Sequence, residues 1–191
     1  MNPAASTETG AAAGCVTGRF QPLHLGHLEL FLRVLQRHER LIVGITNPDA
    51  SARRLVDAHA SRHLRSENPF TYYERLCFVG AALTSAGVRP EVYDIVPFPL
   101  HQPELWFDYV PPGTRQYVRV YSAWEASKAG SMREHGFPVV VVEGAEKAHE
   151  ATVIRHALRH GLAWRESVPP GVAELVDRFL AARSLDQRCG S

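Results

Sequence analysis

Short apolar runs alternate with helical patterns along almost the whole chain, and this alternation constrains the fold more than any other feature. The expected strands span residues 15–18, 41–45, 91–96, 117–121 and 138–142. The expected helices span residues 25–38, 71–86, 104–109, 124–135, 152–160 and 170–183. Strands that alternate with helices form parallel sheets covered on both faces. The sequence therefore predicts a Rossmann-like, doubly wound α/β fold of about five parallel strands with C-terminal helices.

A single domain is expected at 15–184, because 191 residues suffice for one α/β unit with a substantial core. Residues 1–14 are rich in Ala, Thr and Gly and lack the basic and long apolar stretches of a secretory signal, so we expect a disordered leader. We expect a loose tail at 185–191. The polar segment at 46–68 is rich in Arg and His and is expected to be a mobile loop.

Composition argues against several classes of function. The net charge is only +1, so the chain lacks the overall positive charge that nucleic-acid binding usually requires. No apolar run approaches the ~20 residues that cross a membrane. Cys15, Cys77 and Cys189 are too widely spaced for a disulfide framework or a metal site, which favours a cytoplasmic location. A homo-oligomer is compatible with the sequence.

The segment between the first strand and the first helix carries the chemistry; it reads T-G-R-F-Q-P-L-H-L-G-H over residues 17–27. Such turns lie at the carboxyl end of the sheet, where these folds bind ligands. Gly18 lets the backbone turn sharply, and the helix N-terminus that follows offers N–H groups to phosphates. His24 and His27 share a helix face, where each imidazole can donate an N–H to a phosphate oxygen. Gly26 leaves room for a nucleotide.

A zinc site is the alternative interpretation of these histidines, since the chain has ten His residues. However, His24 and His27 have no third ligand at the usual spacing, so no protein metal site is expected. A second alternative concerns a cluster of arginines that could guard a triphosphate or simply form a solvated loop. The cluster comprises Arg53, Arg54, Arg62 and Arg65.

The string G-R-F-Q-P-x-H-x-G-H resembles the signature of the nucleotidylyltransferase superfamily, and in this long form the archaeal-type nicotinamide-nucleotide adenylyltransferases. Three later segments are also similar to that branch. Residues 68–75 match N-P-F-T-x-x-E-R, and residues 97–99 with Leu105-Trp106 resemble its third-strand exit and acceptor-pocket aromatic. Residues 151–155 resemble the start of its phosphate-binding helix, usually S-G-T-E-I-R.

The resemblance implies an enzyme that transfers a nucleotidyl group from ATP or CTP to a phosphate-bearing acceptor and releases pyrophosphate. The attacking oxygen is already ionised, so catalysis would rest on positioning and on stabilising negative charge. The implied catalytic residues are His24, His27 and Arg155. The implied nucleotide-binding residues are Gly18, Arg19, Phe20, Gln21, Gly26 and Thr152. The implied acceptor-binding residues are Phe70, Arg75, Trp106 and Trp124. Mg²⁺ is the implied cofactor and would bridge phosphate oxygens.

Departures from the family pattern gather on the acceptor side. Leu100 and Pro103 stand where archaeal-type members usually carry an Asp and an Asn that help to read the nicotinamide amide. Trp124 replaces a small polar residue, and Glu150 replaces a phosphate-binding Ser. Because a site built around an amide discriminates strongly, the loss of its polar partners changes which acceptor fits.

Three functions therefore remain open. The first is a nicotinamide or nicotinate mononucleotide adenylyltransferase that uses ATP. The second is a relative in specialised metabolism that uses CTP or ATP and acts on another phosphate or phosphonate acceptor. The third is a nucleotide-binding regulator without turnover, against which the presence of His24, His27 and Arg155 counts.

Overall fold

A computed structural model describes residues 13–49, 64–143 and 150–189 of the chain. Within them, five parallel strands form one sheet in the order β3-β2-β1-β4-β5. The strands are β1 (Ala13–Gly18), β2 (Arg40–Thr46), β3 (Tyr93–Phe98), β4 (Arg115–Val120) and β5 (Val139–Glu143). The chain moves outward from β1 to β3 and then returns to the other side of β1, so the strand order reverses between β1 and β4. This confirms the predicted Rossmann-like sheet.

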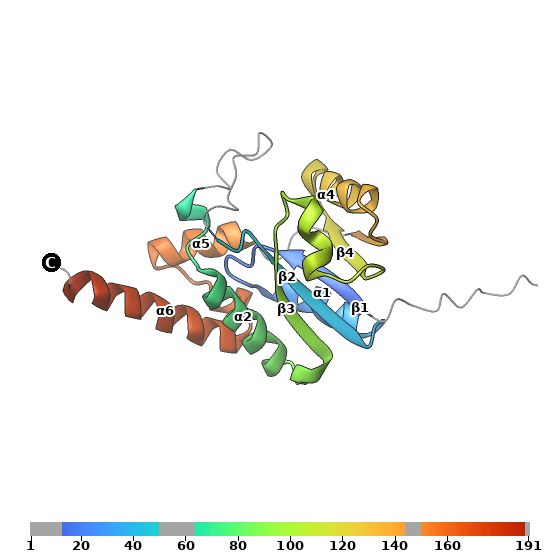
Figure 1. Ribbon diagram of the computed structural model, residues 1–191. Coiled ribbons are helices and arrows are strands. Elements are labelled where there is room, and N and C mark those ends of the chain that lie inside the picture. The colour runs from blue at the N-terminus through green and yellow to red at the C-terminus, as the bar shows by residue number, and fades with distance from the viewer. Residues whose placement is uncertain (1–12, 50–63, 144–149, 190–191) are drawn as a thin grey trace, which may run out of the picture.

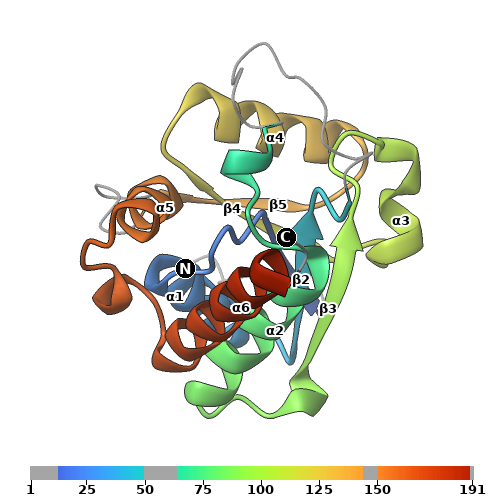
Figure 2. The same ribbon diagram turned by 90° about the vertical axis from the view of Figure 1, so that its left-hand side faces the viewer.

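Helices cover both faces of the sheet (Figures 1 and 2). They are α1 (Leu25–Leu35), α2 (Tyr72–Ser85), α3 (Trp106–Tyr109), α4 (Ala123–Glu134), α5 (Ala151–His160) and α6 (Pro170–Cys189). Helices α1, α2, α5 and α6 pack on one face, whereas α3 and α4 pack on the other. In Figure 2, α4 stands above β4 and β5 and α3 lies to the right of β3, whereas α1, α2 and α6 lie on the opposite side of the sheet. None of the described helices is long and apolar enough to cross a membrane.

The strands are buried on both faces because successive side chains point in opposite directions. In β1, Val16 enters the core under α1, α2 and α6, and Cys15 enters the core under α3 and α4. In β2, Val43 enters the same core as Val16, and Ile42 enters the same core as Cys15. Two cores therefore explain why these strands read as continuous apolar runs rather than as alternating patterns.

Helix α2 begins and ends where the sequence predicts. Its N-cap Thr71 accepts a hydrogen bond at Oγ1 from the Glu74 amide at 3.2 Å, and the Thr71 amide donates to the Glu74 carboxylate at 2.7 Å. Gly87 follows the helix with a φ of 75°. Arg183 of α6 forms an ion pair with Glu74, which joins α6 to the start of α2. The capping box therefore also anchors the C-terminal helix.

Several boundaries differ from the predictions. Strand β3 starts at Tyr93 and continues through Pro97, whereas we expected 91–96; a proline is tolerated there because β3 is an edge strand. Helix α6 runs past the expected end at Arg183 to Cys189, because no Gly or Pro interrupts that stretch. Strand β1 begins at Ala13, so Ala13 and Gly14, which we expected at the end of the leader, belong to the sheet.

Several predictions fall on residues that the structure does not describe. The rest of the leader, at 1–12, lies outside the described residues, as do residues 50–63 of the predicted loop at 46–68. The described parts of that loop are residues 46–49, which start with the last residue of β2, and residues 64–68, which include a short 3₁₀ helix at Arg65–Glu67.

Candidate functional site

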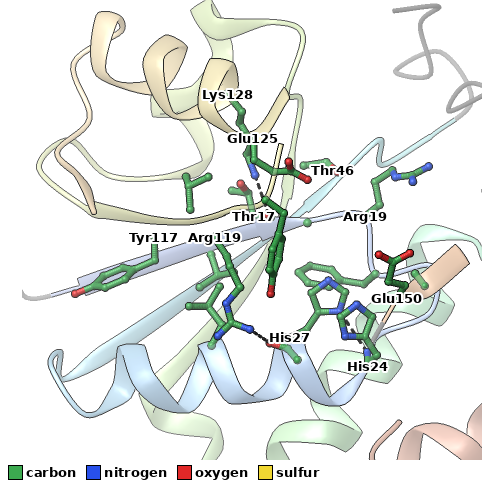
Figure 3. Close-up of a pocket in the computed structure, with 18 of the residues that line it drawn as sticks. Thr17, Arg19, His24, His27, Thr46, Tyr117, Arg119, Glu125, Lys128 and Glu150 are labelled. Carbon is green, nitrogen blue, oxygen red and sulfur yellow. Dashed lines mark hydrogen bonds between the residues drawn. The ribbon is translucent and has the colours of Figure 1, made fainter. Parts of the chain in front are cut away.

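A cavity of about 540 Å³ opens at the carboxyl ends of β1 and β4, where the strand order reverses. This is the position at which doubly wound sheets bind ligands. Most of the predicted site residues line it (Figure 3). They are Gly18, Arg19, Phe20, Gln21, His24, Gly26, His27, Trp124, Thr152 and Arg155.

The loop after β1 makes its sharp turn at Phe20, which has a φ of 50°, and not at Gly18 as the sequence suggested. Gly18 is required for packing instead. A Cβ atom on Gly18 would lie 2.7 Å from the Phe20 ring, too close for any side chain. The Phe20 ring is 1% exposed and meets the His27 ring edge-on, with 4.9 Å between ring centroids. Phe20 therefore supports His27 from behind.

Gln21 connects the same loop to the start of α2. Its side-chain Nε2 donates to the Phe70 carbonyl at 2.8 Å, and its Oε1 accepts from the Phe70 amide at 2.9 Å. Both groups are buried, so the side-chain amide of Gln21 is fully engaged with the backbone of Phe70. The side chain of Gln21 therefore shapes the loop, while the residue still contributes to the cavity wall.

His24 is the N-cap residue of α1, and His27 occupies the first turn of the helix. Their rings stack with centroids 3.6 Å apart and planes inclined by 24°. The backbone amide of His24 donates to Nδ1 of His27 at 3.3 Å. A neutral imidazole whose Nδ1 accepts a hydrogen bond carries its proton on Nε2, so His27 can donate from Nε2.

His27 is held in the neutral form. Burial lowers its pKa well below the usual 6.5, and the positive charges of His24, Arg119 and Lys128 lower it further. At neutral pH the His27 ring is therefore a hydrogen-bond donor without a net charge. Such a ring can donate its single N–H to a phosphate oxygen.

Arg155 reaches the loop from α5 on the other side of the cavity. Its side chain is 2% exposed and forms an ion pair with Glu67. One guanidinium nitrogen donates to the Gln21 carbonyl at 2.9 Å, and the other donates to Thr152 Oγ1 at 3.1 Å. Sequence reasoning missed Glu67, although a buried arginine implies a nearby acceptor or counter-charge.

Two further cations line the cavity that the sequence did not indicate. Arg119 of β4 donates to the Gly26 carbonyl at 3.2 Å and forms an ion pair with Glu29 at 3.0 Å. Lys128 of α4 donates from Nζ to the Thr17 carbonyl at 2.9 Å (Figure 3). An arginine in an otherwise apolar strand was a usable signal for Arg119. Lys128 gives no such signal, because lysines on helices are usually solvated.

Phe70, Arg75 and Trp106 do not line the cavity, so their place on the acceptor side stays a prediction. Arg75 is 2% exposed and donates to four backbone carbonyls. Those carbonyls belong to Arg19, Thr46, Asn47 and Thr71. Its guanidinium fixes the ends of β1 and β2 because it satisfies carbonyls that the strands leave unpaired.

The two aromatic residues of this group belong to the two cores. Trp106 stacks on Phe98 with 5.4 Å between centroids, and its Nε1 donates to the Pro99 carbonyl at 3.0 Å. Phe70 packs edge-on against Phe78 at 4.9 Å. Of the four predicted acceptor residues, Trp124 alone lines the cavity.

Comparison with known proteins gives a family match and two kinds of relative. Residues 15–143 match the family model described as Cytidylyltransferase-like. The chain is 40% identical over 172 residues to a phosphonoformate cytidylyltransferase of Streptomyces viridochromogenes, covering 90% of this chain and 94% of that protein. It is 32% identical over 166 residues to a nicotinamide-nucleotide adenylyltransferase of Picrophilus torridus, covering 86% of this chain and 89% of that protein.

The fold is also similar to that of a bifunctional NMN adenylyltransferase/ADP ribose pyrophosphatase from Francisella tularensis. The TM-score is 0.64 at 17% sequence identity, and the match covers 87% of this chain. The chain spans about half of that bifunctional protein, at 49% of its length. At this identity the likeness supports the Rossmann-like architecture and nothing more specific.

Proposed function

Because the chain belongs to the cytidylyltransferase-like family and is a nucleotidylyltransferase, we propose that it transfers CMP from CTP to a small acceptor that carries a phosphonate group. The predicted enzyme class is confirmed by the family match and by both kinds of relative. The nucleotide and the acceptor are the proposed part. Of the three functions left open by the sequence, this is the second.

The observation that carries the proposal is the 40% identity to the phosphonoformate cytidylyltransferase, which extends over nearly the full length of both chains. The cavity wall supports the same choice. Leu100 and Trp124 line it, where an amide-reading acceptor site would need polar partners. Trp106 lies in the core instead of facing a nicotinamide ring. A small acceptor does not need these contacts.

The proposed reaction is an in-line displacement at the α-phosphorus of CTP. An ionised oxygen of the acceptor phosphonate attacks that phosphorus and forms a new O–P bond. The bond between the α-phosphorus and the oxygen that bridges to the β-phosphorus breaks, and that oxygen leaves with pyrophosphate. No proton is removed from the attacking oxygen, so positioning and charge stabilisation suffice.

The residues of the cavity suit that task. His27 would donate from Nε2 to an oxygen of the α- or β-phosphate, and His24 would contact the neighbouring phosphate. Arg155 would hold the leaving pyrophosphate with the N–H groups at the start of α5, around Thr152. The buried Nε of Arg155 has no hydrogen-bond partner among the described residues and is one donor available for this contact.

We also propose that Mg²⁺ accompanies the nucleotide. The described residues contain no group of three or more His, Cys, Asp or Glu side chains that could hold a metal ion. Mg²⁺ commonly binds through substrate phosphates and water with few protein ligands, so the cavity fits this mode. Several carboxylates line the cavity, and among them we propose that Glu150, two residues before Thr152, contributes a ligand. When bound, the ion would neutralise part of the triphosphate charge.

Adenylyl transfer to nicotinamide mononucleotide is the second candidate. It is favoured by the 32% identity to nicotinamide-nucleotide adenylyltransferases. It is also favoured by the segment at 68–75, which matches their N-P-F-T-x-x-E-R pattern. On this alternative the acceptor is a large nucleotide, and the base of the triphosphate is adenine.

One set of assays separates the two candidates. The protein is incubated with Mg²⁺ and each pairing of CTP or ATP with phosphonoformate or nicotinamide mononucleotide, and pyrophosphate release and the coupled product are measured. We expect release with CTP and phosphonoformate, together with a CMP-linked product. If the only pairing that gives a coupled product is ATP with nicotinamide mononucleotide, the proposal is overturned. His27→Ala serves as the inactive control, and His160→Ala, an exposed histidine of α5, serves as its matched control.

A further inference from the structure

A buried hydroxyl at the end of β1 lacks a hydrogen-bond partner. Thr17 is 8% exposed and lines the cavity, and its Oγ1 has no partner among the described residues. The methyl group of Thr17 packs toward β2, because a Cβ atom on Gly44 would lie 2.8 Å from Thr17 Cγ2. Leaving a buried hydroxyl unpaired is unfavourable, so its position in a cavity wall points to a ligand that satisfies it.

A cation converges on the same residue. Lys128 Nζ donates to the carbonyl of Thr17 at 2.9 Å, so the ammonium group and the hydroxyl lie on one residue of β1. Lys128 is half-buried, and Figure 3 shows its side chain extending from α4 onto Thr17. His24 and His27 stand at the start of α1, in another part of the same view. The cavity wall therefore has a cationic position at Lys128, separate from the two histidines.

Two of the carboxylates that line the cavity have partners of their own. Glu125 lies on α4 three positions before Lys128 and accepts a hydrogen bond from Ser122 Oγ at the start of that helix. Glu29 of α1 is paired with Arg119. A ligand group at Lys128 and Thr17 thus meets one ammonium and one hydroxyl donor.

We propose that Lys128 Nζ and Thr17 Oγ1 bind a second anionic group of the acceptor, namely a carboxylate close to the reacting phosphonate. This inference rests on the proposed function, because it specifies the acceptor of that reaction. A carboxylate has two acceptor oxygens, which match one ammonium donor and one hydroxyl donor. A neutral amide would not gain the charge-assisted bond to Lys128.

The acceptor that fits is compact. The positive charge of Lys128 contributes to the lowered pKa of His27, so the ammonium lies within electrostatic range of the ring that would contact the α-phosphate. Thr17, Lys128 and His27 also line the same cavity, so a compact acceptor would place its carboxylate and its phosphonate within reach of both positions. A carboxylate bonded directly to the phosphonate phosphorus meets this requirement.

The test compares two acceptors that differ in the carboxylate, phosphonoformate and methylphosphonate, with CTP and Mg²⁺. The variants are Lys128→Met, Lys128→Arg and Thr17→Val, and the control is Arg133→Met, an exposed cation on the same helix. We expect the wild-type enzyme to prefer phosphonoformate in kcat/KM. In Lys128→Met this preference should fall ~10- to 100-fold, as expected when a hydrogen bond to a charged group is lost. Lys128→Arg should recover part of the preference, and Arg133→Met should retain all of it.

Thr17→Val tests the subsite independently of the Lys128 variants, because it removes the hydroxyl while it keeps the shape of the side chain. A hydroxyl without a protein partner does not stabilise the fold, so the Tm of this variant should equal or exceed that of the wild type. Its KM for phosphonoformate should rise, while its KM for methylphosphonate should change little. A clearly lower Tm would show that the hydroxyl has a structural role and would overturn the inference.

The remaining outcomes are also decisive. Equal losses with both acceptors, or a higher KM for CTP in Lys128→Met, would assign Lys128 to the nucleotide and overturn the carboxylate subsite. These failures leave wild-type turnover of phosphonates intact. If the wild-type enzyme releases no pyrophosphate with either phosphonate, the proposed function itself is rejected, and the subsite falls with it.

Discussion

The backbone amide of His24 points at Nδ1 of His27, with the two nitrogen atoms 3.3 Å apart. One histidine therefore sets the tautomer of the other through its main chain rather than through its ring. The result is a neutral donor at a fixed position, supported by the Phe20 ring, before any nucleotide binds. Preorganised donors of this kind are usually the largest contribution to the stabilisation of developing charge.

Replacing His27 tests this contribution directly. His27→Ala should lower kcat by ~100-fold or more, as the loss of one preorganised donor typically does. His27→Gln should retain more activity than His27→Ala, because its amide can still donate. The measurement is pyrophosphate release under saturating substrates. Wild-type turnover in His27→Ala would remove His27 from the mechanism.

The lowered pKa of His27 predicts a dependence of stability on pH. In the unfolded chain His27 takes up a proton as the pH falls through 6.5, whereas in the folded protein it stays neutral to a much lower pH. Proton uptake by the unfolded state therefore destabilises the fold progressively below pH 6.5. The Tm of the wild type should drop between pH 7 and pH 5, and His27→Gln should show a smaller drop. Identical slopes in thermal melts of the two proteins would contradict this prediction.

Two glycines of the nucleotide loop should respond differently to alanine. In Gly18→Ala the new Cβ would overlap the Phe20 ring, so we expect a loss of ~1–3 kcal/mol of stability and impaired catalysis through His27. In Gly26→Ala the new Cβ would lie 3.3 Å from the His24 ring, which must shift by a few tenths of an ångström, so we expect a smaller change in stability than in Gly18→Ala. Because Gly26 lines the cavity, the KM for the nucleotide should nevertheless rise. Urea unfolding and steady-state kinetics together separate these effects.

The ion pair between Arg155 and Glu67 combines stability with a predicted catalytic role. Arg155→Met leaves the Glu67 carboxylate in a largely buried position, which should cost ~3 kcal/mol of unfolding free energy. The double variant Arg155→Met/Glu67→Gln should recover much of this loss, because no charge is left unpaired. Turnover should stay low in both variants if Arg155 contacts the pyrophosphate. Recovery of turnover in the double variant would show that Arg155 matters only for the fold.

Arg75 should behave as a structural residue. Arg75→Lys keeps the charge but cannot donate to all of the carbonyls that the guanidinium now satisfies, so we expect a loss of ~2–3 kcal/mol of stability. Because Arg75 does not line the cavity, the KM for the acceptor should change less than threefold at a temperature where the variant is folded. A threefold change corresponds to ~0.7 kcal/mol. A large KM effect with normal stability in urea would restore the acceptor role that the sequence suggested.

The fold was largely predictable, because its signals are local. Apolar runs, the capping box at Thr71 and Glu74, and the glycine after α2 each depend on residues close in sequence. The end of β3 was not predictable in this way. Proline stops a strand unless the strand lies at an edge, and the position of a strand in the sheet depends on the whole topology.

The site was predictable where one continuous segment builds it. His24, Gly26 and His27 lie within one helical turn, so their spacing already indicates a shared purpose. The acceptor roles of Arg75 and Trp106 stay predictions, because motif position does not reveal whether a side chain points into the core or into the cavity, and both side chains are buried outside the cavity. The sequence did not identify Lys128 as a site residue, because its partner Thr17 is distant in sequence and only the folded chain brings the two together.

Pro97 in β3 has a consequence for how copies of this molecule behave at high concentration. It pairs by register with Ile45 of β2, so its ring occupies a place where other strands would carry an amide hydrogen. Strand β3 is at the edge of the sheet, and the proline leaves it with one amide donor fewer. A strand that lacks a donor is a poorer template for pairing with a strand of another copy, so Pro97 disfavours edge-to-edge association at β3.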